Sequence, residues 1–185
     1  MAVYSLRRII KETYTIVVMC GAISLIAGVV LNLQIEKIIM VPTILLMIPP
    51  INDIGGNIGC IIGARLASAL HMGTVEPKLK KQRVLRMNVN ATMLMSLLMF
   101  LITSAALFSG LSVFNIGPSP LRLTLSFMLA GIFLTPIVVL CSVGLAFISF
   151  IKGWDPDNVV SPLITSIADV LGVICLLIAI KIIGV

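Results

Sequence analysis

The sequence predicts an all-α, polytopic membrane protein with five transmembrane helices. Of its 185 residues, 59% are hydrophobic and only 11% are charged, whereas an ordinary soluble domain has about 25% charged residues. Uncharged stretches long enough to cross the hydrocarbon core, which takes about 20 residues, recur along the chain, and most charges lie at their ends. These proportions exclude a soluble enzyme and a nucleic-acid-binding protein. They predict a multi-pass protein of the cell membrane with no soluble partner.

The first two predicted spans cover residues 13–35 and 38–73. The first contains no charged residue, and the second contains only Asp53 and Arg65. The middle of the second span reads IPPINDIGGN, where two prolines remove backbone donors and two glycines weaken the helix. We therefore expect two half-helices joined by an irregular segment near the middle of the membrane. Residues 1–12 are expected to form an interfacial helix with basic anchors.

The other three predicted spans cover residues 87–112, 122–151 and 158–181. The one charged residue that lies away from their ends is Asp169. Five spans are an odd number, so the two termini are expected on opposite sides of the membrane. We expect the whole chain to form one transmembrane domain.

The distribution of Lys and Arg predicts the orientation of these spans, because cytoplasmic loops carry an excess of basic residues. With the N-terminus inside and the C-terminus outside, three basic residues fall outside: Lys37, Arg122 and Lys181. Nine then fall inside: Arg7, Arg8, Lys11, Lys78, Lys80, Lys81, Arg83, Arg86 and Lys152. This orientation is therefore predicted.

Asp169 is the most informative polar residue, because eleven uncharged residues flank it on each side. A carboxylate near the middle of the bilayer costs at least about 2.5 kcal/mol, and such groups usually face a cavity or a pathway. Thr165 lies four residues earlier, on the same helical face, and is followed by Ser166. Two alternatives stay open: a protonated acid with one interhelical hydrogen bond, or an ion pair with Arg65.

A second group of polar residues surrounds Gly56 in the second span: Asn52, Asp53 and Asn57. Together with the Asp169 group they offer carboxylate, amide, hydroxyl and carbonyl oxygens, the donors that suit hard cations. The four cysteines lie in apolar stretches and His71 is the single histidine, so no zinc or copper site is expected. Few carboxylates favour Mg²⁺, which keeps several of its waters when it binds protein.

Two segments carry a resemblance to a known family. Residues 50–59 read PINDIGGNIG and are followed at residues 64–73 by ARLASALHMG; residues 155–162 read DPDNVVSP and continue as LITSIAD to Asp169. These motifs resemble the second and fifth spans of magnesium transporters of the MgtE type. Their details are more similar to the branch in solute carrier family 41.

The resemblance implies an ion pathway at the axis of a homodimer, lined by the second and fifth spans. It assigns the binding of hydrated Mg²⁺ to Asp169 and places Asn57 beside the pathway. Animal members hold two five-span units in one chain, whereas this chain has one, which implies that two chains pair. The two Asp169 carboxylates would then face each other and balance one divalent charge.

The chain also departs from the family pattern. Ile61 stands where the bacterial signature has glutamine, and Asp53 stands where relatives carry glycine or an apolar residue. Only about a dozen residues precede the first span, so the magnesium-sensing cytoplasmic domain of bacterial members is not expected here.

The predicted function is the transport of a divalent cation, Mg²⁺ foremost, by a protein that is not an enzyme. A carrier coupled to Na⁺ or H⁺ through Asp53 remains an alternative. More distant are a non-transporting membrane subunit and an intramembrane aspartyl protease that pairs Asp53 with Asp169. The candidate metal-binding residues are Asp169, Asn57, Asp53, Thr165, Gly56, Asn52 and Ser166.

Overall fold

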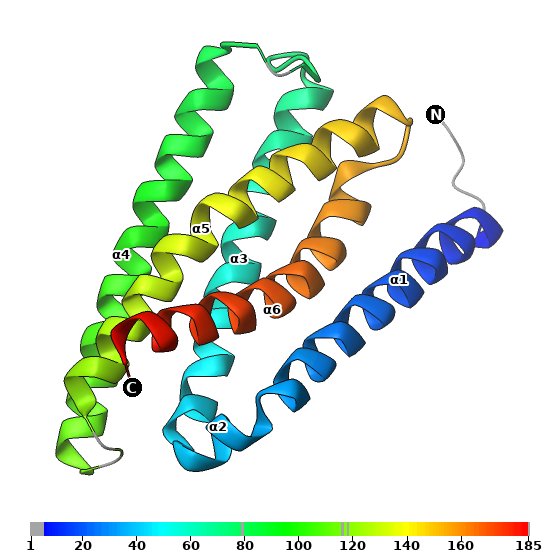
Figure 1. The fold of residues 1–185 in the computed structure, drawn as a ribbon. Helices are drawn as coiled ribbons and strands as arrows, with labels where there is room; N and C mark the ends of the chain where they lie inside the picture. Colours follow the sequence, from blue (N-terminus) through cyan, green and yellow to red (C-terminus); the bar gives the residue numbers. More distant parts are fainter. Residues whose placement is uncertain (1–5, 79, 116, 118, 185) are drawn as a thin grey trace.

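The computed structural model describes residues 6–78, 80–115, 117 and 119–184, which form a bundle of α-helices without a strand in these ranges (Figure 1). Five of the helices are long and apolar enough to cross a membrane. The predicted all-α fold with five membrane-spanning helices is therefore confirmed. The helices are α1 (Leu6–Leu33), α2 (Ile35–Met40), α3 (Thr43–His71), α4 (Arg83–Val113), α5 (Pro120–Ile151) and α6 (Pro156–Ile183).

The N-terminal region differs from the expected interfacial helix. Residues 6–12 continue without interruption into the first spanning helix, α1, and residues 1–5 lie outside the described residues. After α1 the chain forms the short helix α2 and turns at Val41 and Pro42 before α3 begins at Thr43. The proline fixes a backbone φ of −58° at this start, which is compatible with helix entry.

The expected break in the second span is wrong: α3 is one continuous helix of 29 residues, with Pro49 and Pro50 inside it. The prolines still remove two backbone donors, but only about two turns of helix precede them. Those turns are held by burial, because Ile44, Met47 and Ile51 are at most 2% exposed. Packing of this face against the core outweighs the local preference for a break.

Glycines spaced four residues apart bring α3 close to α5 and α6. Gly55, Gly59 and Gly63 lie on one face of α3. A Cβ on Gly59 would lie 2.5 Å from Cγ1 of Ile164 in α6 and 3.0 Å from Cγ1 of Val138 in α5. Small residues allow helix backbones to approach closely inside a membrane, where packing rather than water exclusion drives association.

Hydroxyl groups connect the same helices. Ser142 of α5 donates a hydrogen bond of 2.5 Å to the carbonyl oxygen of Gly59. Ser96 of α4 and Thr135 of α5 form a buried hydroxyl pair, and Thr135 also donates to the carbonyl oxygen of Gly131. These bonds satisfy polar groups that hydrocarbon could not, and they fix the order α3, α5, α4.

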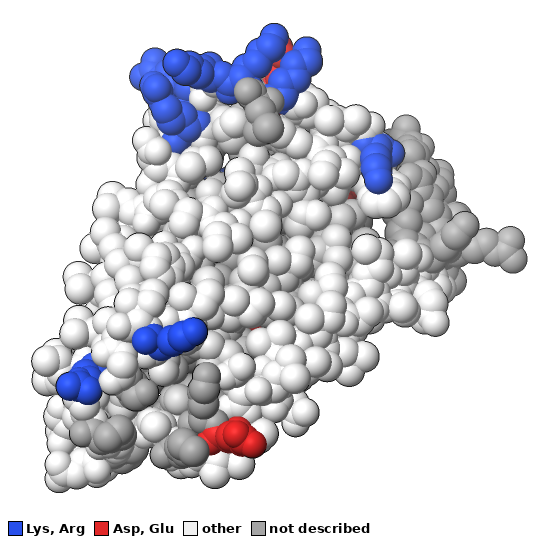
Figure 2. Space-filling model, in the orientation of Figure 1, with Lys and Arg blue, Asp and Glu red and all other residues white. Residues whose placement is uncertain are grey.

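On the face that Figure 2 shows, charged side chains lie mainly at the two ends of the bundle, and a wide, almost uncharged surface separates them. The loop after α3 meets the end of α5, because the rings of His71 and Phe150 are 5.6 Å apart. Lys152 and the basic α3–α4 loop therefore lie at one end of the bundle. Arg122, near the start of α5, and Lys181, near the end of α6, both lie at the other end. Which end faces the cytoplasm stays a prediction.

Candidate functional site

The candidate site lies along the line of contact between α3 and α6, which we call the α3–α6 seam. Gly55 contacts Ala168, whereas Gly63, about two turns later on α3, contacts Val160, which is earlier on α6. The two helices therefore run antiparallel. The seam residues are Asn52, Gly55, Gly56, Gly59 and Gly63 on α3, which meet Val160, Ile164, Thr165, Ala168 and Gly172 on α6.

Asn52 faces Gly172 across this seam. A Cβ on Gly172 would overlap the Oδ1 atom of Asn52 and would lie 3.4 Å from the Cγ atom of Asn52. This oxygen is buried and accepts no hydrogen bond from the described residues. The side-chain amide oxygen of Asn52 is therefore directed into the contact between α3 and α6 and not toward the open side of the seam.

Asp169 occupies the middle of α6, as the fourteenth of its 28 residues. It lies one turn from Thr165 and one turn from Gly172, both of which contact α3. The side chain is half-buried, and within the described part of the chain it forms neither a hydrogen bond nor an ion pair. The two internal partners considered for it, an interhelical hydrogen bond and a salt bridge to Arg65, are both absent from the described residues.

Asp53 and Asn57 lie on α3, each next to a seam residue and turned outward from it. Both are exposed although they belong to a membrane-spanning helix, and Asn57 is the fifteenth of the 29 residues of α3. Their spacing of four puts them on one face. Gly56 is buried, and a Cβ on it would lie 3.3 Å from Cγ2 of Thr165. The absence of a side chain at Gly56 thus allows the polar residues of α3 to lie close to Thr165 of α6.

Ser166 is the one candidate that lies on the side of its helix facing away from the seam. It lies about 200° around α6 from both Ile164 and Ala168, the residues that contact α3. It is only 6% exposed, and its hydroxyl donates to the carbonyl oxygen of Pro162 at 3.2 Å. The hydroxyl of Ser166 is therefore bonded to the backbone of its own helix and does not face α3.

The hydroxyl of Thr165 is used in a similar way. It donates to the carbonyl oxygens of Pro162 at 2.8 Å and Ser161 at 3.2 Å. A hydroxyl has one donor and two acceptor lone pairs. With its proton engaged by the backbone, the Thr165 oxygen can still accept a hydrogen bond from a water.

Cys60 is a seam neighbour that the sequence did not single out. Its thiol donates to the carbonyl oxygen of Ser161 at 3.6 Å, so the residue contacts α6 and is only half-buried. Its spacing of three from Asn57 would have placed it on the same face. Although it lies in an apolar stretch, Cys60 therefore bonds to the backbone of α6.

The seam collects oxygen acceptors without forming a closed metal site. In the described residues no three His, Cys, Asp or Glu side chains come together in a way that could hold a metal ion. Asp169, Asp53, Asn57 and Thr165 instead offer oxygens that border the seam in the middle third of the membrane spans. Such an arrangement can accept hydrogen bonds from the waters of a hydrated cation.

The fold and this seam define a multi-pass helical membrane protein with unpaired carboxylates inside its spans, the features of an ion-transporting protein. A family model for the MgtE divalent cation transporters matches residues 48–179, more than two thirds of the chain. The chain belongs to the MgtE family of divalent cation transporters. It is a transporter and not an enzyme, as its sequence predicts. No curated protein and no solved structure matches the chain.

Proposed function

We propose that the chain transports Mg²⁺ through a pathway between two copies of itself, lined by α3 and α6. The observation that carries this proposal is the set of polar side chains in mid-span that have no partner within the described chain: Asp169, Asp53 and Asn57. In a single copy their exposed edges would meet lipid, which is costly for a carboxylate. A second copy that covers the open side of the seam would enclose these groups in a polar pathway.

The chemistry of the seam favours Mg²⁺ that keeps part of its water shell. The waters of a hydrated cation are hydrogen-bond donors, so the pathway needs acceptors rather than a cage of direct ligands. Asp169 and Asp53 supply carboxylates, Asn57 an amide oxygen, and Thr165 a hydroxyl lone pair. Two copies contribute two Asp169 side chains, whose charges together balance one divalent ion. Without the ion these carboxylates repel each other or share a proton.

The proposal also includes the orientation of the chain in the membrane and its likeness to the solute carrier family 41 branch. The termini lie on opposite sides of the membrane, with the basic α3–α4 loop in the cytoplasm. The likeness of the motifs to solute carrier family 41 suggests how one five-span unit pairs with another.

Mg²⁺ uptake into proteoliposomes that contain an Mg²⁺-sensitive dye tests the role of Asp169. Asp169→Asn removes the charge with almost no change in volume, and we expect the flux to fall at least about tenfold, since removal of a charged partner of a cation costs on the order of 1.5–3 kcal/mol. Asp169→Glu should retain part of the flux. Glu36→Gln, an exposed carboxylate of α2 outside the spanning helices, is the control and should transport like the parent.

A flux of Asp169→Asn equal to that of the parent would contradict the proposal. The same result in both variants, with transport lost in Asp169→Asn and in Glu36→Gln alike, would point to a general charge effect instead.

A coupled exchanger is the second candidate, and the position of Asp53 favours it. This second carboxylate lies beside the same seam, where a Na⁺ or H⁺ could bind in exchange for Mg²⁺. Flux measured at fixed membrane potential, with and without a sodium or proton gradient, separates the two. A channel follows the Mg²⁺ gradient and the membrane potential, whereas an exchanger also requires the sodium or proton gradient and loses this requirement in Asp53→Asn.

A further inference from the structure

A cluster of exposed basic residues lies on the hairpin formed by α3, α4 and their loop. Between residues 65 and 86 there are six basic residues and one acidic residue, Glu76. All six basic side chains are exposed. We call this surface the hairpin cluster, and its members are Arg65, Lys78, Lys80, Lys81, Arg83 and Arg86.

The charges of this cluster are almost uncompensated within the chain. Glu76 pairs with Lys78 at 3.5 Å, and this is the one ion pair between described residues. The other five cations form no ion pair with a described carboxylate, and like charges repel one another. Arg83 and Arg86 also lie in the first turn of α4, which contains no acidic residue, although the helix dipole disfavours cations there. The described part of the chain therefore does not supply the anions that would balance the charge of the cluster.

Hydrogen bonds hold the described residues of the loop that carries the cluster. The side chain of Gln82 accepts a hydrogen bond from the backbone N–H of Glu76 at 2.7 Å and donates to the carbonyl oxygens of Glu76 and Lys78, each at 2.9 Å. Val75 is buried, at 2% exposure, and its N–H donates to the carbonyl oxygen of Ala69. The cations thus project from a folded hairpin rather than from a free tail.

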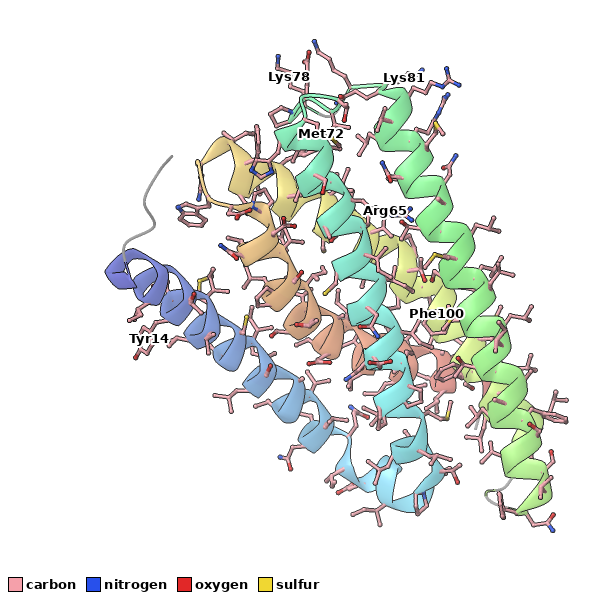
Figure 3. All side chains as sticks on the ribbon, turned by 180° about the vertical axis from the view of Figure 1, so that it is seen from behind. Tyr14, Arg65, Met72, Lys78, Lys81 and Phe100 are labelled. Atoms are coloured by element: carbon pink, nitrogen blue, oxygen red, sulfur yellow. The ribbon has the colours of Figure 1, made fainter. Side chains whose placement is uncertain are left out.

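The position of the cluster selects its partner. Arg65 lies six residues before the end of α3, about 9 Å along the helix, and Figure 3 shows it below the loop that carries Lys78 and Lys81. Met72, at the same end, is 70% exposed. Cations that extend from within a spanning helix to the loop beyond it occupy the depth of lipid phosphates, which long basic side chains reach by extending along the helix.

We propose that the hairpin cluster binds the headgroups of anionic phospholipids in the leaflet next to it. Clusters of four to eight basic residues beside a membrane span attract such lipids, and the attraction falls with increasing salt. The opposite end of the bundle differs, because Arg122 there donates to the carbonyl oxygen of Gly184 at 3.1 Å and only Lys181 accompanies it on α5 and α6.

The single tryptophan provides a direct measurement. Trp154 is 51% exposed at the same end of the bundle, and Nζ of Lys152 lies 5.2 Å from the centre of its ring. The protein is reconstituted in vesicles of equal parts phosphatidylcholine and phosphatidylglycerol, with brominated chains on one lipid at a time. We expect brominated phosphatidylglycerol to quench Trp154 more strongly than brominated phosphatidylcholine does, and the difference to shrink at high salt.

Lys80→Gln/Lys81→Gln should lower this preference at least about fivefold, because each basic residue adds to the attraction. Lys80→Arg/Lys81→Arg keeps the charge and should retain the preference. Arg122→Gln/Lys181→Gln removes the same number of charges at the other end and should also retain it.

Equal quenching by the two lipids in the parent protein would overturn the proposal, and so would an equal loss in both glutamine variants. Loss of the preference on addition of inorganic phosphate at constant ionic strength would assign the cluster to a soluble phosphate rather than to lipid. None of these outcomes depends on Mg²⁺ transport.

Discussion

The amide oxygen of Asn52 lies so close to Gly172 that a Cβ on that residue would overlap it. This contact joins α3 to α6 one turn from Asp169, in the centre of the membrane spans. The oxygen is buried without a donor in the described chain, an arrangement that costs on the order of 1–3 kcal/mol. The same oxygen of Asn52 is therefore both a close contact between the helices and an unsatisfied hydrogen-bond acceptor.

Gly172→Ala is expected to displace the Asn52 side chain at this point. The new methyl group would overlap the Asn52 oxygen, and because the end of a side chain can rotate away, we expect a cost of about 1 kcal/mol, the lower end for overpacking. Thermal unfolding in detergent and Mg²⁺ flux should both decline. Adding Asn52→Ala to Gly172→Ala makes room and should restore part of the loss. A single Gly172→Ala variant as stable and active as the parent would show that the contact is not limiting.

Gly59→Ala tests the glycine face of α3 in the same way. Its Cβ would lie 2.5 Å from Ile164 and 3.0 Å from Val138, so we expect a loss of about 1–3 kcal/mol. Gly144→Ala is the matched control, because nothing lies within 4 Å of its Cβ position. That substitution should be neutral or stabilise by up to about 1 kcal/mol through helix propensity. Similar unfolding temperatures for the two variants would argue against the close approach of α3, α5 and α6.

Asp53 and Asp169 are expected to contribute unequally to transport. Asp169 is half-buried beside the seam, whereas Asp53 is exposed and turned outward from it, and the attraction between a carboxylate and a cation in the seam falls with distance. Asp53→Asn should therefore lower the rate of Mg²⁺ flux by less than Asp169→Asn does. Initial rates at several Mg²⁺ concentrations measure both effects. A larger loss in Asp53→Asn would move the main binding site to α3.

Mg²⁺ should stabilise the folded protein, because a ligand that binds only the native state raises the free energy of unfolding. At a concentration about 100 times the dissociation constant, the gain is about 2.7 kcal/mol. Unfolding temperatures measured with Mg²⁺ and after chelation should differ in the parent and converge in Asp169→Asn. Equal stabilisation of both proteins would place the bound ion elsewhere.

The orientation can be measured with single cysteines at the two ends. The four native cysteines are buried or half-buried in spanning helices, so a membrane-impermeant maleimide should react with them slowly. In intact cells we expect Lys181→Cys to be labelled and Lys80→Cys to be protected until the membrane is permeabilised. The opposite pattern would reverse the predicted orientation.

Individual elements show where sequence reasoning succeeded and where it failed. Asp169 could be singled out because a carboxylate flanked by long apolar segments is visible without any tertiary information. The continuity of α3 could not be predicted, because Pro49 and Pro50 argue for a break by local rules. The burial of Met47 and Ile51 that overrides them depends on the helices packed around them.

The sequence by itself determined the class of protein, the number of spans and the residues that are costly in lipid. These follow from composition and from the length of apolar segments, which are properties of the chain alone. Only the tertiary structure decided how the polar residues are sorted. The side chain of Asn52 points into the contact with Gly172, and Asp53 and Asn57 lie on the open side of α3. Ser166 lies away from the seam. The reason is physical: the direction of a side chain around a helix acquires meaning only when a neighbouring helix is placed, and here glycines on both helices set that placement.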